Sequence, residues 1–122
     1  MKLKDLKNKL VEIFFGNSLS TRTTNNIDIS AELAKKILEK DKNAILLDVR
    51  SIAEYNEGHI SGAVVITNYE LEKDMLRFIT NKDETILAYC TTGSRSKKAV
   101  KLLRRLGYIN AYNIIGGLDN WD

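Results

Sequence analysis

Apolar residues along the chain form two patterns that alternate, and their alternation predicts an α/β fold. Short continuous apolar runs, typical of strands covered on both faces, occur at residues 44–47, 63–66, 85–89 and 111–115. Between these runs, apolar residues recur at the three- and four-residue steps of amphipathic helices, over residues 31–40, 69–79 and 95–106. Strands that alternate with helices predict a parallel sheet with helices on both faces.

Capping signals support the predicted helix boundaries. Ser30 is a suitable N-cap for the helix that follows it. Ser51 and Glu54 have the spacing of a capping box, which predicts a short additional helix that ends at Gly58. In the helix predicted over residues 69–79, four apolar residues share one side: Leu71, Met75, Phe78 and Ile79.

The first 26 residues differ from the rest. Leu3, Leu6, Leu10, Val11 and Phe14 recur at helical spacing and predict an N-terminal amphipathic helix, while residues 16–26 are rich in Gly, Ser, Thr and Asn and predict a linker. We therefore divide the chain into an N-terminal helix with linker (1–26) and one domain (27–122). Packing of that helix against the domain or a partner chain is favoured over a membrane-surface role.

Composition narrows the classes of protein. The chain has 122 residues, of which 43% are hydrophobic and 29% charged, as in an ordinary globular domain. A net charge of +3 gives no reason to expect nucleic acid as a partner. The apolar run after Glu12 is too short for a signal peptide or a membrane span, so no membrane association is expected. The single cysteine excludes an intramolecular disulfide and favours a cytoplasmic location.

That cysteine stands where a predicted strand meets a helix, which is where parallel sheets bind ligands. The connecting loop has the sequence Cys90, Thr91, Thr92, Gly93, Ser94, Arg95. Gly93 permits a tight turn, the small polar residues offer donors, and backbone N–H groups at the start of a helix form a cradle for an anion. Because helix N-termini and cations lower the pKa of cysteine, we predict that Cys90 is largely thiolate and nucleophilic.

Four segments, in order, resemble the rhodanese homology family over about residues 27–121. They are Ile45–Arg50 with its Asp-x-Arg signature, Glu54–Ala63, the loop Cys90–Arg95, and Gly116–Trp121. Ser61 stands where the family commonly has proline. The resemblance implies a three-layer domain with a central parallel sheet of about five strands and helices on both faces.

The resemblance also implies a thiosulfate sulfurtransferase that works through a persulfide. In that reading Cys90 takes the outer sulfur of a small anionic donor such as thiosulfate and passes it to cyanide, a thiol or a protein acceptor. The loop amides, with Thr91, Thr92 and Ser94, stabilise the persulfide, and Arg95 positions the donor. Two-step covalent transfer implies ping-pong kinetics. Neither a metal nor an organic cofactor is expected.

Other interpretations remain open. A cysteine phosphatase or arsenate reductase needs five residues between Cys and Arg, whereas this loop has four, and Tyr89 stands where phosphatases usually carry histidine. A docking or regulatory module is a second alternative, although Cys90, Gly93 and Arg95 are all retained. A persulfide carrier for one protein partner is a third. We expect His59 to have a structural role. We expect polar contacts near the first strand–helix junction from Asp48, Arg50 and Glu54.

Overall fold

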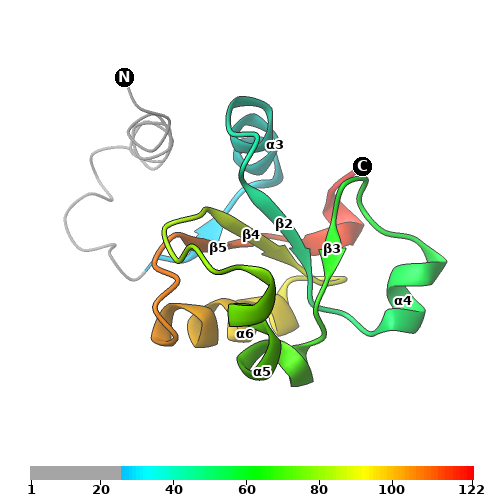
Figure 1. The fold of residues 1–122 in the computed structure, drawn as a ribbon. Helices are drawn as coiled ribbons and strands as arrows, with labels where there is room; N and C mark the ends of the chain where they lie inside the picture. Colours follow the sequence, from blue (N-terminus) through cyan, green and yellow to red (C-terminus); the bar gives the residue numbers. More distant parts are fainter. Residues whose placement is uncertain (1–25) are drawn as a thin grey trace.

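A computed structural model describes residues 26–122 (Figure 1); the predicted N-terminal helix and nearly all of the predicted linker lie outside this range. The sheet has five parallel strands in the order β1-β5-β4-β2-β3. The strands are β1 (Asp28–Ile29), β2 (Ile45–Asp48), β3 (Val64–Val65), β4 (Ile86–Tyr89) and β5 (Ala111–Ile114). The prediction of a parallel α/β domain is confirmed.

Helices cover both faces of this sheet, as Figure 1 shows. On one face lies α3 (Ala31–Lys40), and on the other lie α5 (Leu71–Phe78) and α6 (Ser94–Arg105). The short helix α4 (Ile52–Glu57) stands beside the sheet, and two 3-10 turns, η2 (Asn68–Glu70) and η3 (Gly117–Asn120), complete the described elements. The domain is therefore built of three layers.

The central strand β4 is apolar throughout because both of its faces are buried. Ile86, Ala88 and then Cys90 belong to the buried cluster under α5 and α6, whereas Leu87 and Tyr89 belong to the cluster under α3. Successive side chains of a strand point to opposite faces, and both faces are covered here. The same alternation places Cys90 on the α6 side of the sheet.

The predicted caps are present. The Ser30 hydroxyl accepts the Leu33 N–H at 3.0 Å, and Ser51 and Glu54 form the predicted capping box at the start of α4. Gly58 ends that helix as predicted. An N-cap of this kind contributes about 1 kcal/mol to stability.

Two details of the apolar pattern were predicted wrongly. The strand expected to be buried over residues 63–66 is only β3, an edge strand paired with β2 alone, and its Val64 is 49% exposed. Phe78, predicted to share one side of the helix with Leu71, Met75 and Ile79, is 68% exposed, whereas those three are buried; α5 ends at Phe78, and the extended backbone at Ile79 buries that next side chain.

Candidate active site

Cys90 lies directly after β4, and its sulfur atom is met by several hydrogen-bond donors. The residue is 1% exposed. Its Sγ accepts the N–H of Gly93 at 3.1 Å and the N–H of Ser96 at 3.4 Å, and the Ser96 hydroxyl also lies 3.4 Å away. A sulfur atom so placed is buried, but in a polar niche that suits an anion.

The backbone of the loop produces this arrangement. Gly93 has a φ of +111°, a left-handed conformation that favours glycine, and it is the N-cap residue of α6. A Cβ at this position would also come within 3.3 Å of the Gly116 nitrogen. The turn therefore directs the free N–H groups and the positive dipole end of α6 toward Sγ.

The segment that follows β5 holds the other side of the loop. The Leu118 N–H donates to the Cys90 carbonyl at 2.8 Å, and the Asp119 N–H donates to the Thr91 carbonyl at 3.0 Å. Gly117 is packed so closely here that a Cβ would lie 2.3 Å from the Cys90 carbonyl oxygen. The two carbonyls at the start of the loop are thereby fixed by a segment distant in sequence.

These contacts decide the acidity of the thiol. Burial is the largest single influence and by itself would raise the pKa of Cys90. Hydrogen bonds from the Ser96 hydroxyl and from the N–H groups of Ser96, Gly93 and Thr92 act in the opposite direction, and together they hold the pKa of Cys90 below its ordinary value. The niche therefore favours the nucleophilic thiolate.

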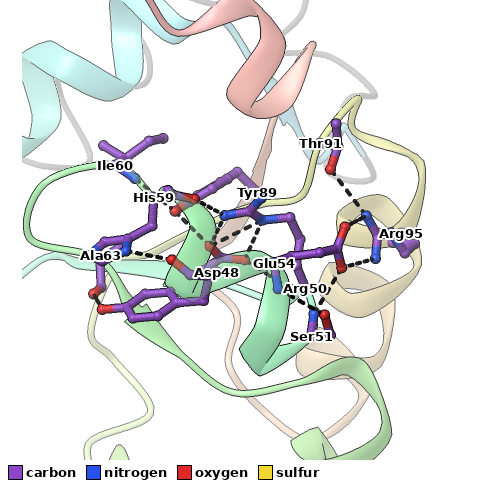
Figure 2. A network of polar contacts seen from close by, with 12 residues as sticks. Asp48, Arg50, Ser51, Glu54, His59, Ile60, Ala63, Tyr89, Thr91 and Arg95 are labelled. Atoms are coloured by element: carbon purple, nitrogen blue, oxygen red, sulfur yellow. Dashed lines mark hydrogen bonds and ion pairs between the residues drawn. The ribbon is translucent and has the colours of Figure 1, made fainter.

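Arg95 closes the loop by binding a carboxylate from another element (Figure 2). Its two terminal nitrogens donate to the carboxylate oxygens of Glu54 at 2.9 and 3.0 Å, and one of them also donates to the Thr91 hydroxyl at 3.2 Å. The hydrogen bond from Arg95, together with one from the Ser51 N–H, lowers the pKa of Glu54 to about 2. The residue that caps α4 thus also anchors the arginine of the Cys90 loop.

A second ion pair lies deeper, at the end of β2 (Figure 2). Arg50 donates to the buried carboxylate of Asp48 at 2.8 Å and to the carbonyl of Gly58 at 2.7 Å. The Tyr89 hydroxyl donates to the same carboxylate at 2.8 Å. Burial, the largest effect, and the Asp48 carboxylate raise the pKa of Tyr89 to about 12. These groups tie β2 to β4 and to the chain after α4.

His59 makes local contacts rather than contacts with the loop. Its ring stacks on that of Tyr55, with centroids 3.7 Å apart and planes inclined by 5°. Its Nδ1 lies 2.9 Å from the Tyr55 carbonyl oxygen. This placement agrees with the structural role expected for it.

The structure brings together only part of the predicted site. Gly93 and the Arg95 anchor frame Cys90, whereas Thr92 and Ser94 are exposed at the surface of the loop. Sequence reasoning missed Ser96, which shares the inward side of α6 with Ala99, Val100 and Leu103. A serine at helical spacing with three apolar core positions was the available signal.

The described part of the chain has neither a cluster of metal ligands nor a helix that could span a membrane. Within residues 26–122, no group of three or more His, Cys, Asp or Glu side chains could hold a metal ion. Over the same range, the helices are too short or too polar to cross a lipid bilayer.

Comparison with known proteins identifies the class. Residues 30–122 match the Rhodanese-like domain family, and the chain belongs to it. The Bacillus subtilis protein YrkF, named as a sulfur carrier, is 32% identical over 107 residues, which are 87% of this chain and 57% of that protein. A tRNA uridine(34) hydroxylase of Buchnera aphidicola is 36% identical over 74% of this chain and 30% of its own length. The chain thus spans less than two thirds of these relatives.

A solved structure of similar size gives a closer functional comparison. The human single-domain sulfurtransferase TSTD1 is 30% identical, with a TM-score of 0.69, and the alignment covers 78% of this chain and 94% of that one. Membership of the family and this similarity support sulfur transfer as the general activity of the domain.

Proposed function

We propose that the protein is a sulfurtransferase that carries a sulfane sulfur as a persulfide on Cys90 and takes it from thiosulfate or a similar anionic donor. The observation that carries this proposal is the convergence of two backbone N–H groups and one hydroxyl on a single buried sulfur. Such a niche stabilises the negative charge of the Cys90 thiolate, the form that attacks the donor.

The proposed reaction has two displacement steps. The Cys90 thiolate attacks the outer sulfur of thiosulfate, the new Sγ–S bond forms, and the S–S bond of the donor breaks so that its electron pair leaves with sulfite. In the second step a thiol or cyanide attacks the outer sulfur, and the electron pair of the Sγ–S bond returns to Cys90. No net oxidant is consumed, and the enzyme ends as it began.

The loop residues have separable roles in this scheme. The N–H groups of Thr92, Gly93 and Ser96 hold the charge of the sulfur anion. Arg95 contributes a positive charge at the loop and, through Glu54 and Thr91, fixes its shape. Thr92 and Ser94 are exposed residues of the loop, and in this scheme their hydroxyls bind the donor.

A persulfide carrier for a protein acceptor is the second candidate. The similarity to YrkF, which is named as a sulfur carrier, supports this acceptor class. Both candidates share the loading of Cys90 and differ only in what takes the sulfur. A lone cysteine that must stay reduced between turnovers supports a cytoplasmic location for either one.

Steady-state kinetics test the small-molecule reaction. With thiosulfate as donor and cyanide as acceptor, we expect thiocyanate to form and double-reciprocal plots to give parallel lines. Cys90→Ser should form none. Hydrolysis of a phosphate ester in place of sulfur transfer would overturn the proposal, because it would indicate the phosphatase chemistry considered from the sequence.

A further inference from the structure

A chain of polar contacts extends from Cys90 to the edge of the sheet. The Ser96 hydroxyl, next to the sulfur, is 2.5 Å from Asn113 Oδ1. The Nδ2 of Asn113 donates to Asp28 Oδ1 at 3.0 Å, and Lys97 donates to Asp28 Oδ2 at 3.0 Å. Ser96 and Asn113 are both buried, so water does not substitute for the contact between these two side chains.

The hydroxyl of Ser96 has one proton and three acceptors within reach. These are Asn113 Oδ1 at 2.5 Å, the Gly93 carbonyl at 3.2 Å and Cys90 Sγ at 3.4 Å. A hydroxyl donates its proton to one acceptor at a time, and the shortest contact is the one to the amide. Donation to the sulfur therefore requires the hydroxyl to turn away from Asn113.

Asp28 determines which atom of the Asn113 amide faces Ser96. An ionised carboxylate can only accept hydrogen bonds, and Asp28 is paired with the ammonium group of Lys97. The amide nitrogen must therefore point to Asp28, which leaves the amide oxygen toward Ser96. Strand β1 thus fixes the orientation of a side chain on β5 that contacts α6.

We propose that Asn113, oriented by Asp28, is a positioning residue that competes with the Cys90 sulfur for the proton of the Ser96 hydroxyl. When the sulfur is a neutral thiol, the hydroxyl donates to Asn113. When the sulfur is an anion, as in the thiolate, the hydroxyl turns and donates to it. The inference depends on the proposed function only in taking an anionic Cys90 as the reactive species.

Most charged groups near the site keep their partners in the variants that test this idea, whereas Asp28 loses the hydrogen bond from Asn113 when that residue is replaced. Arg95 of α6 lies at the loop, where it interacts with Glu54 of α4 and with Cys90. The side chains of Lys97 and Asp28 are joined to the sulfur through Asn113 and Ser96. On the other side of the sheet, Asp48 is paired with Arg50 and bound by Tyr89. Replacing Asn113 in the Ser96→Ala background therefore separates the effect of the hydroxyl on the thiol pKa from an effect of Asp28.

The test is the thiol pKa, obtained from the pH dependence of thiolate absorbance and of iodoacetamide alkylation. Ser96→Ala removes a donor, and the pKa should rise by about one unit. Asn113→Ala removes the competing acceptor, so the pKa should fall by a smaller amount. The double variant should match Ser96→Ala alone, because Asn113 acts only through the hydroxyl.

Two control variants test whether the change in pKa comes from the loss of the Asn113 amide. Asn113→Val removes the amide at similar volume and should also lower the pKa of Cys90. Asn110, whose side chain donates to the Asp83 carbonyl, directly precedes β5, and Asn110→Ala should leave that pKa unchanged. The proposal is overturned if Asn113→Ala and Asn113→Val raise the pKa, or if they shift it equally in the Ser96→Ala background. Alkylation needs no sulfur donor, so this outcome is independent of whether thiosulfate loads the enzyme.

Discussion

The contact between Gly117 and the Cys90 loop offers a sharp test of how the niche is built. Gly117 has a φ of +56°, and a Cβ there would lie 2.3 Å from the carbonyl oxygen of Cys90 and 2.7 Å from that of Thr91. Ordinary contact begins at 3.4 Å, so Gly117→Ala must move backbone atoms by about 1 Å. The atoms displaced belong to the first two residues of the loop.

The size of the effect follows from the interactions that the movement disturbs. The hydrogen bonds to the Cys90 and Thr91 carbonyls, at 2.8 and 3.0 Å, would be strained or lost, at about 0.5–1.5 kcal/mol each. The left-handed φ adds about 1 kcal/mol, partly offset by the stiffer unfolded chain. We expect Gly117→Ala to lower the free energy of unfolding by about 2–4 kcal/mol, which is a fall in Tm of roughly 10–25 °C for a domain of this size.

Gly62→Ala is the matched control. Gly62 also has a positive φ, +88°, but a Cβ there would meet nothing within 4 Å. Its substitution therefore measures the conformational cost alone, about 1 kcal/mol or less. Thermal and urea unfolding measure the stability of each variant. The alkylation rate of Cys90 shows whether the hydrogen-bond donors around its sulfur are still in place. Equal stability and equal alkylation rates in Gly117→Ala and Gly62→Ala would refute the claim that the close packing of Gly117 holds the Cys90 loop in place.

Two further predictions concern the polar ties of Figure 2. Tyr89→Phe removes the hydroxyl that donates to Asp48 and accepts the Ile60 N–H, so unfolding should become easier by about 1–3 kcal/mol while Cys90 alkylation is unchanged; altered alkylation would contradict this separation. Glu54→Gln retains a cap for α4 but loses the charge that binds Arg95. Because the pKa of Glu54 is lowered from 4.5 to about 2, its contribution is present above pH 4.5 and lost as the pH falls through 2. The side chains of Arg95 and Glu54 are 42% and 33% exposed, so their ion pair contributes less than about 1 kcal/mol to stability. The acid unfolding curves of the wild type and of Glu54→Gln should therefore converge near pH 2.

Much of the fold was predictable because the central strands and the helix caps have strong local signals. The apolar strands β2, β4 and β5 are covered on both faces, and Ser30, Ser51 and Glu54 use side chains to satisfy helix ends. The edge strands were harder, since β1 and β3 have two residues each and no periodicity can be read in so short a segment. The existence of a fifth strand came from the family resemblance.

The active-site loop was predictable in its residue types but not in its contacts. Cys90, Gly93 and Arg95 stand together in the sequence, so their association required no knowledge of the fold. The contact between Ser96 and Asn113 links residues 17 positions apart, and it exists only because the first turn of α6 packs on β5. The pairing of Arg95 with Glu54 spans 41 positions, and nothing in either local pattern indicates it.

The direct test of the central claim is the intact mass of the protein after treatment with thiosulfate and removal of the excess. We expect the wild-type chain to gain the mass of one sulfur atom, to lose it on addition of cyanide, and the Cys90→Ser variant to gain nothing. A wild-type chain that remains unmodified while Cys90 is reduced and reactive toward iodoacetamide would contradict the account.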